Sequence, residues 1–119
     1  MMEKRKYARV PDGAKVVYKV MGVKGEHLTP ALDMGSGGLR LPLQEKVKPG
    51  TLLELNISLP EDKEPFFGLV KAVWQSTVAT QDKDGLSYYE TGIEFIKVGL
   101  ENRRRIVKYV TDYAKKNNL

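Results

Sequence analysis

Alternating apolar and polar residues mark several short extended segments along the chain. The clearest segment is residues 51–59, where one parity is apolar throughout: Leu53, Leu55, Ile57 and Leu59. The residues between them are polar, and a period of two is typical of a strand that buries one face. Pro49-Gly50 precedes this segment and Pro60 follows it, which supplies turn-forming residues at both ends.

Further extended segments lie on both sides of this strand. Residues 16–20 and 26–32 flank a stretch with two glycines and predict a hairpin. Residues 66–76 are apolar on both parities, which predicts a long central strand covered on both faces, with Trp74 in the core. A turn at residues 82–85 leads to a last alternating segment at residues 89–95.

After residue 95 the spacing of apolar residues becomes helical. Five residues share one predicted helical face: Ile106, Val107, Val110, Tyr113 and Ala114. Several short antiparallel strands and one terminal helix predict a mostly β domain. Its sheet is expected to close or nearly close into a barrel, with the helix packed on it or plugging one end. The 119 residues contain no repeat and no long linker, so we expect a single domain.

The positive charge of the chain is concentrated at its two ends. The formal net charge is +5, but residues 11–100 together carry a net −2. A barrel that tracks nucleic acid needs a basic groove on its face, so a nucleic-acid partner is disfavoured. An oligonucleotide-binding barrel remains an alternative because of the size, the β content and the basic ends of the chain.

Several kinds of chemistry lack the residues they require. Cysteine is absent and His27 is the only histidine, which leaves no cysteine metal site and no apparent nucleophile, base and acid cluster. We therefore expect no catalytic residue, no metal ligand and no enzyme activity, and we assign His27 no role. No apolar segment is long enough to span a membrane, so we expect a cytoplasmic protein without membrane insertion.

Two groups of residues could bind a ligand. Arg5 and Arg9 lie four residues apart in a basic segment without clear strand or helix periodicity. Residues 33–38 read Asp-Met-Gly-Ser-Gly-Gly and connect two expected strands. Glycine at such a place permits positive φ and lets a ligand approach the backbone.

Together these groups resemble the signature of the PilZ domain family. Its members carry an Arg-x-x-x-Arg motif, matched by Arg5 and Arg9, and a later Asp/Asn-x-Ser-x-x-Gly motif, matched at its ends by Asp33 and Gly38. Three further segments resemble the family's GG, V-x-W and G-x-x-F strands: residues 37–39, 70–74 and 91–95. The likeness therefore extends over nearly the whole chain.

The resemblance implies a fold and a division of the chain. The fold is a six-stranded antiparallel PilZ-type β-barrel with a C-terminal α-helix. Residues 1–13 would be a flexible basic arm, residues 14–97 the barrel, and residues 98–119 the helix and tail.

The resemblance also implies that the ligand is cyclic di-GMP. The implied ligand-binding residues are Arg5, Arg9, Asp33, Gly35, Ser36, Gly37 and Gly38. Arginine forks pair bidentately with phosphate or with guanine O6 and N7, so two arginines suit a ligand with two phosphates and two guanines. No cofactor is implied. One position departs from the motif, because Gly35 replaces the serine and Ser36 is displaced by one residue. Loss of a charge-assisted contact there would weaken binding by roughly tenfold to a hundredfold.

The implied function is that of a bacterial second-messenger receptor. Bound cyclic di-GMP would change the contact with an unidentified protein effector that controls motility, biofilm formation or polysaccharide production. The alternative is a degenerate PilZ-like adaptor that binds no nucleotide and acts only through protein contacts. The loss of the serine favours this adaptor, whereas the intact arginine pair speaks against it. Self-association is left open.

Overall fold

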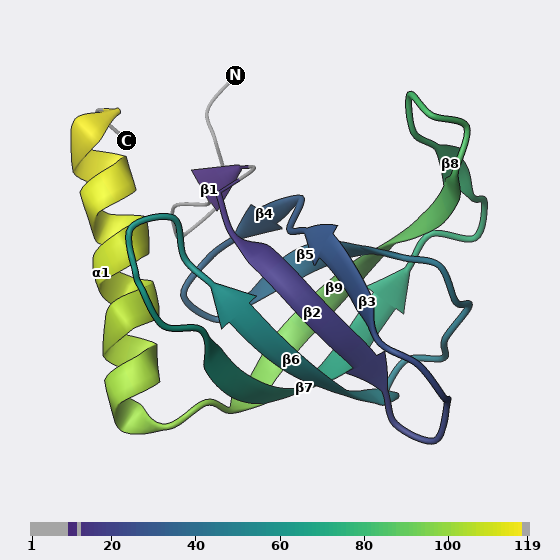
Figure 1. Ribbon diagram of the computed structural model, residues 1–119, viewed down its shortest axis with the longest axis horizontal. Helices are drawn as coiled ribbons and strands as arrows, with labels where there is room; N and C mark the ends of the chain where they lie inside the picture. The colour runs from purple at the N-terminus through teal and green to yellow at the C-terminus, as the bar shows by residue number, and fades with distance from the viewer. Residues whose placement is uncertain (1–9, 12, 118–119) are drawn as a thin grey trace.

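The computed structural model describes residues 10, 11 and 13–117, which form one antiparallel sheet and one helix (Figure 1). The elements in chain order are β1 (Val10–Pro11), β2 (Lys15–Val20), β3 (His27–Pro30), β4 (Asp33–Met34), β5 (Gly38–Leu43), β6 (Leu52–Ser58), β7 (Phe66–Gln75), β8 (Thr80–Gln81), β9 (Ser87–Lys97) and α1 (Leu100–Lys116). The predicted hairpin, the strand at residues 51–59 and the terminal helix are confirmed.

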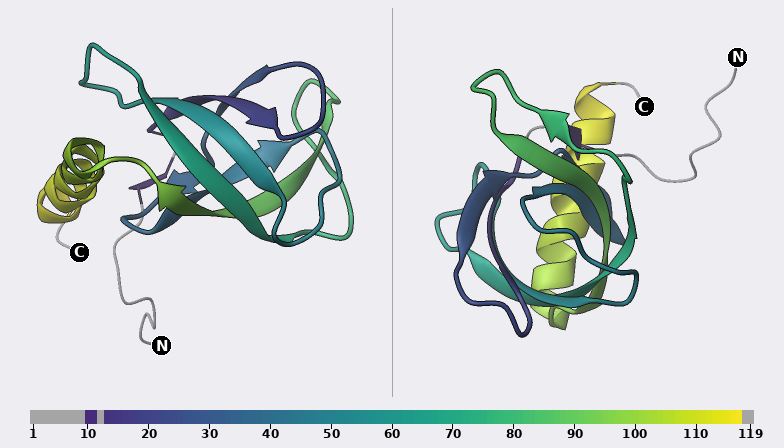
Figure 2. Two further views of the ribbon diagram at one scale, coloured as in Figure 1. Left: turned by 90° about the horizontal axis from the view of Figure 1, so that it is seen from below. Right: turned by 90° about the vertical axis from the view of Figure 1, so that its right-hand side faces the viewer.

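The strands follow the order β1-β4-β5-β9-β7-β6-β2-β3, and β8 pairs with the start of β9. This sheet curls into a half-barrel, as the two views in Figure 2 show. The mostly β fold with a C-terminal helix is therefore confirmed, but nine strands are described where six were expected. The three additional strands, β1, β4 and β8, have two residues each. A pattern with a period of two cannot detect elements this short.

The segment between β3 and β4 ties two parts of the curled sheet together. The backbone N–H of Ala31 donates to the carbonyl of Ala14 at 2.8 Å, and that of Leu32 donates to the carbonyl of Arg40 at 2.8 Å. These bonds connect the start of β2 to β5, which are not neighbours in the sheet order. They fix the position of Asp33, which follows directly.

The inner face of the sheet is the hydrophobic core. Its largest fully buried apolar side chains come from β2, β4, β5, β6, β7 and α1: Val16, Tyr18, Met34, Leu39, Leu41, Leu43, Leu53, Leu55, Ile57, Val70 and Ile106. Apolar residues that alternate along each strand thus share one interior, which supplies most of the driving force for folding. Helix α1 lies across one end of the half-barrel, opposite the β8–β9 hairpin (Figure 2).

Helix α1 buries a narrower face than the sequence predicts. Ile106 and Val110 are buried, and Tyr109 and Tyr113 pack against the core. Val107 was expected on this face, but its exposed fraction is 44%. Adjacent residues of a helix point about 100° apart. The barrel end covers the side of the helix that carries Ile106, so Val107 points away from it.

Strand β7 differs from its prediction on its outer face. Phe67, Val73 and Trp74 are exposed by 50%, 45% and 44%, so the strand is covered on one face only. The expected core position of Trp74 is therefore wrong. The register of β7 against β9 shifts between Ala72 and Trp74, which indicates a β-bulge. The additional residue reverses the parity of the side chains and turns Trp74 outward.

The first strand lies inside the segment expected to be an arm. Val10 of β1 is buried and pairs with Met34 of β4. The described sheet therefore begins at Val10 and not at residue 14. Within the described residues, no helix has both the length and the apolar character needed to cross a membrane.

Candidate ligand-binding groove

An open groove of about 560 Å³ lies on the outer face of the sheet, over β5, β9 and β7. Its lining residues are Asp33, Gly37, Gly38, Leu39, Arg40, Val73, Trp74, Glu90, Gly92, Ile93 and Glu94. This volume falls within the range typical of small-molecule sites, roughly 300 to 1,000 Å³. Antiparallel register creates the groove, because Arg40 lies opposite Gly92 of β9 and Gly92 lies opposite Trp74 of β7. Three strands thus present one row of residues.

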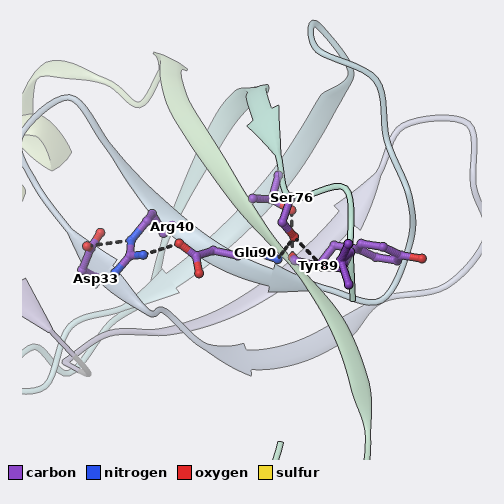
Figure 3. Close-up of polar contacts among 7 residues, drawn as sticks. Asp33, Arg40, Ser76, Tyr89 and Glu90 are labelled. Atoms are coloured by element: carbon purple, nitrogen blue, oxygen red, sulfur yellow. Dashed lines mark hydrogen bonds and ion pairs between the residues drawn. The ribbon is translucent and has the colours of Figure 1, made fainter. Parts of the chain in front are cut away.

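An arginine held between two carboxylates forms one wall of the groove (Figure 3). The Nε of Arg40 donates to Oδ2 of Asp33 at 2.8 Å, and its Nη1 donates to Oε1 of Glu90. Asp33 lies directly opposite Arg40 in the pairing of β4 with β5, whereas Glu90 is its diagonal neighbour on β9. Such cross-strand pairs orient side chains on one face of a sheet.

Glu90 is itself fixed to the end of β7. The backbone N–H of Ser76 donates to the carbonyl of Glu90 at 2.9 Å, and the N–H of Glu90 donates to Oγ of Ser76 at 3.1 Å (Figure 3). The carboxylate that holds Arg40 therefore extends from a backbone segment with two hydrogen bonds of its own.

The groove carries more negative than positive charge. Arg40 is the only cation among the lining residues of the described chain, beside the carboxylates of Asp33, Glu90 and Glu94. Partial burial acts to lower the pKa of Arg40, but its hydrogen bonds to Asp33 and Glu90 outweigh this effect and raise that pKa. Arg40 is thus a permanent cation whose charge is largely balanced by its own neighbours.

Trp74 forms the facing wall, and Gly92 makes room for it. A Cβ at Gly92 would lie 2.1 Å from Nε1 of the indole, so the ring occupies the space of the missing side chain. The indole has a half-exposed face beside the groove. An aromatic ring in this position can stack on a planar ligand.

The glycine-rich turn between β4 and β5 forms the floor beside Asp33. Within the turn, the N–H of Gly35 donates to the carbonyl of Gly38 at 2.8 Å. Neither Gly37 nor Gly38 has a positive φ, in contrast to the expectation for this loop. Gly38 is needed for a different reason, because a Cβ there would lie 2.0 Å from the carbonyl oxygen of Ile93. The absence of a side chain lets β5 approach β9 closely.

Gly38 and Gly37 should therefore differ sharply in their tolerance of alanine. Gly38→Ala is expected to lower the free energy of unfolding by about 1 to 3 kcal/mol, because the backbone of β9 cannot move away easily. Gly37→Ala should change it by less than about 0.5 kcal/mol, since the space around it is open. Urea denaturation of both variants measures the difference. Equal stability of the two variants would contradict this explanation of Gly38.

The structure brings some of the predicted site residues together and leaves others aside. Asp33, Gly37 and Gly38 line the groove, whereas Gly35 is buried in the turn and Ser36 is half-buried beside it. Arg5 and Arg9 lie outside the described residues. Sequence analysis missed Arg40, Trp74 and Glu90. Of these three residues, only Trp74 belongs to a segment that the sequence analysis singled out, the V-x-W segment. The bulge that exposes its side chain cannot be detected in the sequence.

Comparison with known protein families identifies the chain. The model of the PilZ domain matches residues 3–112, which is most of the sequence. The chain belongs to the PilZ domain family. The family resemblance of the sequence motifs is thereby confirmed. A search of curated proteins found no match.

Several solved structures share this fold at low sequence identity. The PilZ domain of Escherichia coli YcgR with c-di-GMP has a TM-score of 0.65 and 13% identity, with 98% of both chains covered. The K. pneumonia MrkH–c-di-GMP complex has a TM-score of 0.74 and 18% identity over 99% of this chain and 55% of that one. The Bacillus subtilis inhibitor of motility MotI/DgrA has a TM-score of 0.67 and 19% identity over 97% and 53%. The chain thus spans about half the length of MrkH and MotI.

Proposed function

We propose that this PilZ domain is a receptor for cyclic di-GMP, which it binds in the groove without carrying out chemistry. One observation carries the proposal. Strand β1 pairs with β4 so that Pro11 lies opposite Asp33 and Val10 lies opposite Met34. The described part of the sheet therefore starts beside the second motif, one residue after Arg9, the last residue of the first motif.

The length of the chain lets both arginines reach the groove. Arg9 is bonded directly to Val10, and five residues lead from Val10 back to Arg5. An extended segment of that length spans at most about 18 Å. We propose that residues 1–9 act as a basic arm that closes over the ligand, with Arg5 and Arg9 as its binding residues.

The distribution of charge supports a site in which this arm binds the phosphates and the groove binds the bases. Cyclic di-GMP carries two phosphates, which a groove with three carboxylates and one balanced arginine would not attract. The first ten residues carry a net +3 and can supply that attraction. The groove instead offers groups suited to bases: carboxylates that accept from guanine N1 and N2, the indole of Trp74, and the glycines at residues 37 and 38.

Titration calorimetry with cyclic di-GMP tests the proposal, with cyclic di-AMP and a short single-stranded oligonucleotide as comparisons. We expect saturable binding of cyclic di-GMP and much weaker binding of the other two. Binding of none of them would favour the ligand-free adaptor, whereas preference for the oligonucleotide would favour a nucleic-acid-binding barrel.

The motif departure at Gly35 gives a complementary test. Gly35→Ser restores the hydroxyl at the motif position and is expected to tighten binding by about tenfold to a hundredfold, because a charge-assisted hydrogen bond would be regained. Calorimetry on this variant and on Ser36→Ala, which removes the displaced hydroxyl, measures the effect. No gain in Gly35→Ser would mean that the turn compensates for the missing serine, and a loss in Ser36→Ala would assign that compensation to Ser36.

We propose that the signal passes on through a protein contact. The likeness to an inhibitor of motility and to a c-di-GMP-dependent transcription regulatory factor supports a regulatory role. Closure of the arm over the groove would change the surface that an effector protein meets. Motility, biofilm formation and polysaccharide production are the proposed processes, in the cytoplasm.

A further inference from the structure

We propose that Arg40 is a base-reading residue of this groove, which donates to O6 and N7 of a bound guanine and sets the preference for guanine over adenine. This inference rests on the proposed function, because it assigns a role within the same site. Neither family motif contains this position.

The charge around Arg40 favours a base over a phosphate as its partner. Asp33 and Glu90 together offer two negative charges to the single positive charge of Arg40. The charges of these three side chains sum to −1, so Arg40 offers no excess positive charge to a phosphate. Its guanidinium still presents hydrogen-bond donors, which suit the neutral acceptors of a guanine edge.

The geometry around Arg40 fixes the plane of those donors. Nε points to Asp33 on one side and Nη1 points to Glu90 on the other, so the guanidinium is held at two of its three nitrogens. An arginine has five N–H donors, and these two bonds use two of them. The side chain is 37% exposed and lines the groove. Little conformational entropy is lost when a guanidinium held in this way binds a ligand.

The cross-strand row places a stacking surface beside this donor group. Arg40 and Trp74 lie on either side of Gly92 in the register, about two strand spacings or roughly 10 Å apart at the backbone. A base that stacks on the indole can therefore extend its edge toward Arg40. Guanine presents the acceptors O6 and N7 on this edge, whereas adenine replaces O6 with an amino donor that would face the donors of Arg40.

A cycle that combines one substitution in the protein with one in the ligand tests this role. The protein change is Arg40→Lys, which keeps the positive charge beside Asp33 but removes the planar fork. The ligand change is the 7-deazaguanine analogue of cyclic di-GMP, in which C–H replaces N7. We expect Arg40→Lys to weaken binding of cyclic di-GMP by about tenfold or more, as a bidentate contact to guanine implies. The loss of affinity caused by 7-deazaguanine should be about tenfold smaller in Arg40→Lys than in the wild type.

Salt dependence and a matched control distinguish base reading from a charge effect. Arg40→Lys should leave the dependence of affinity on salt unchanged, because the contact that is lost is to a neutral base. Lys19→Gln, which removes an exposed cation of β2 that does not line the groove, should change neither affinity nor the response to 7-deazaguanine. Thermal melting confirms that each variant is folded.

The outcomes separate this inference from the proposed function. One outcome is that the wild type binds cyclic di-GMP while 7-deazaguanine lowers affinity equally in the wild type and in Arg40→Lys. This result would overturn the role of Arg40 and leave the receptor function in place. If Arg40→Lys binds cyclic di-GMP as tightly as the wild type does, the role of Arg40 is likewise overturned and the receptor function stays in place. If the wild type binds no cyclic di-GMP at all, the proposed function and this inference fail together.

Discussion

Arg9→Ala is expected to weaken the binding of cyclic di-GMP at least tenfold, and Arg5→Ala should do the same. In the proposed site each arginine would supply a charge-assisted, forked contact worth about 1.5 to 3 kcal/mol, in a groove whose own lining is net negative. The double variant should lose most measurable affinity. Calorimetric titration of the three variants measures these losses.

The stability of the free protein separates a lost contact from a damaged fold. Arg5 and Arg9 precede the first described strand, so we expect their replacement to leave the melting temperature nearly unchanged. Lys6→Ala is the matched control, because it removes one positive charge from the same segment without altering the motif. Its affinity should fall only slightly. Equal affinities in the wild type, Arg5→Ala and Arg9→Ala would overturn the assignment of the arm.

Trp74→Ala is expected to produce the second large loss, of about fivefold to more than a hundredfold in affinity. Stacking of one base on an aromatic side chain is worth about 1 to 3 kcal/mol. The indole is 44% exposed, so its removal should cost less stability than removal of a core residue. Val73→Ala is the control, because Val73 is exposed to a similar degree on the same bulge and lines the same groove.

Fluorescence offers a direct measurement at this residue. Trp74 is the only tryptophan of the chain, so the intrinsic tryptophan emission comes from the wall of the groove. Ligand binding should change that emission with the same midpoint as the calorimetric titration. Trp74→Ala with unchanged calorimetric affinity would show that the indole does not contact the ligand.

Local patterns were sufficient to predict the main strands and the helix. Residues 51–59 alternate strictly because β6 buries every second side chain, and the change to helical spacing after residue 95 marks α1. The two-residue strands β1 and β4 could not be found this way. They exist because their partners lie beside them in the curled sheet, and that proximity is a property of the tertiary fold.

The candidate groove shows a similar division. Asp33 and the glycines at residues 37 and 38 could be selected from the sequence because they form a compact motif. Arg40 and Glu90 are 50 residues apart in sequence, and only the pairing of β5 with β9 brings them together. Trp74 was misplaced because a single additional residue in β7 reverses the alternation on which the prediction depended.

The role of Asp33 illustrates how structure refines a motif. Sequence reasoning selected Asp33 as a ligand-binding residue implied by the second motif. In the described residues it accepts a hydrogen bond from Arg40, an arginine outside both motifs. The second motif therefore orients a side chain in the strand that follows it.

The most direct test of the account is a titration of the full chain with cyclic di-GMP, followed by calorimetry and by the fluorescence of Trp74. We predict saturable binding that both signals report with one affinity and that cyclic di-AMP does not reproduce. Heat and emission that stay flat across the titration, or that respond equally to both dinucleotides, would contradict the claim that this groove is a guanine-dinucleotide receptor site.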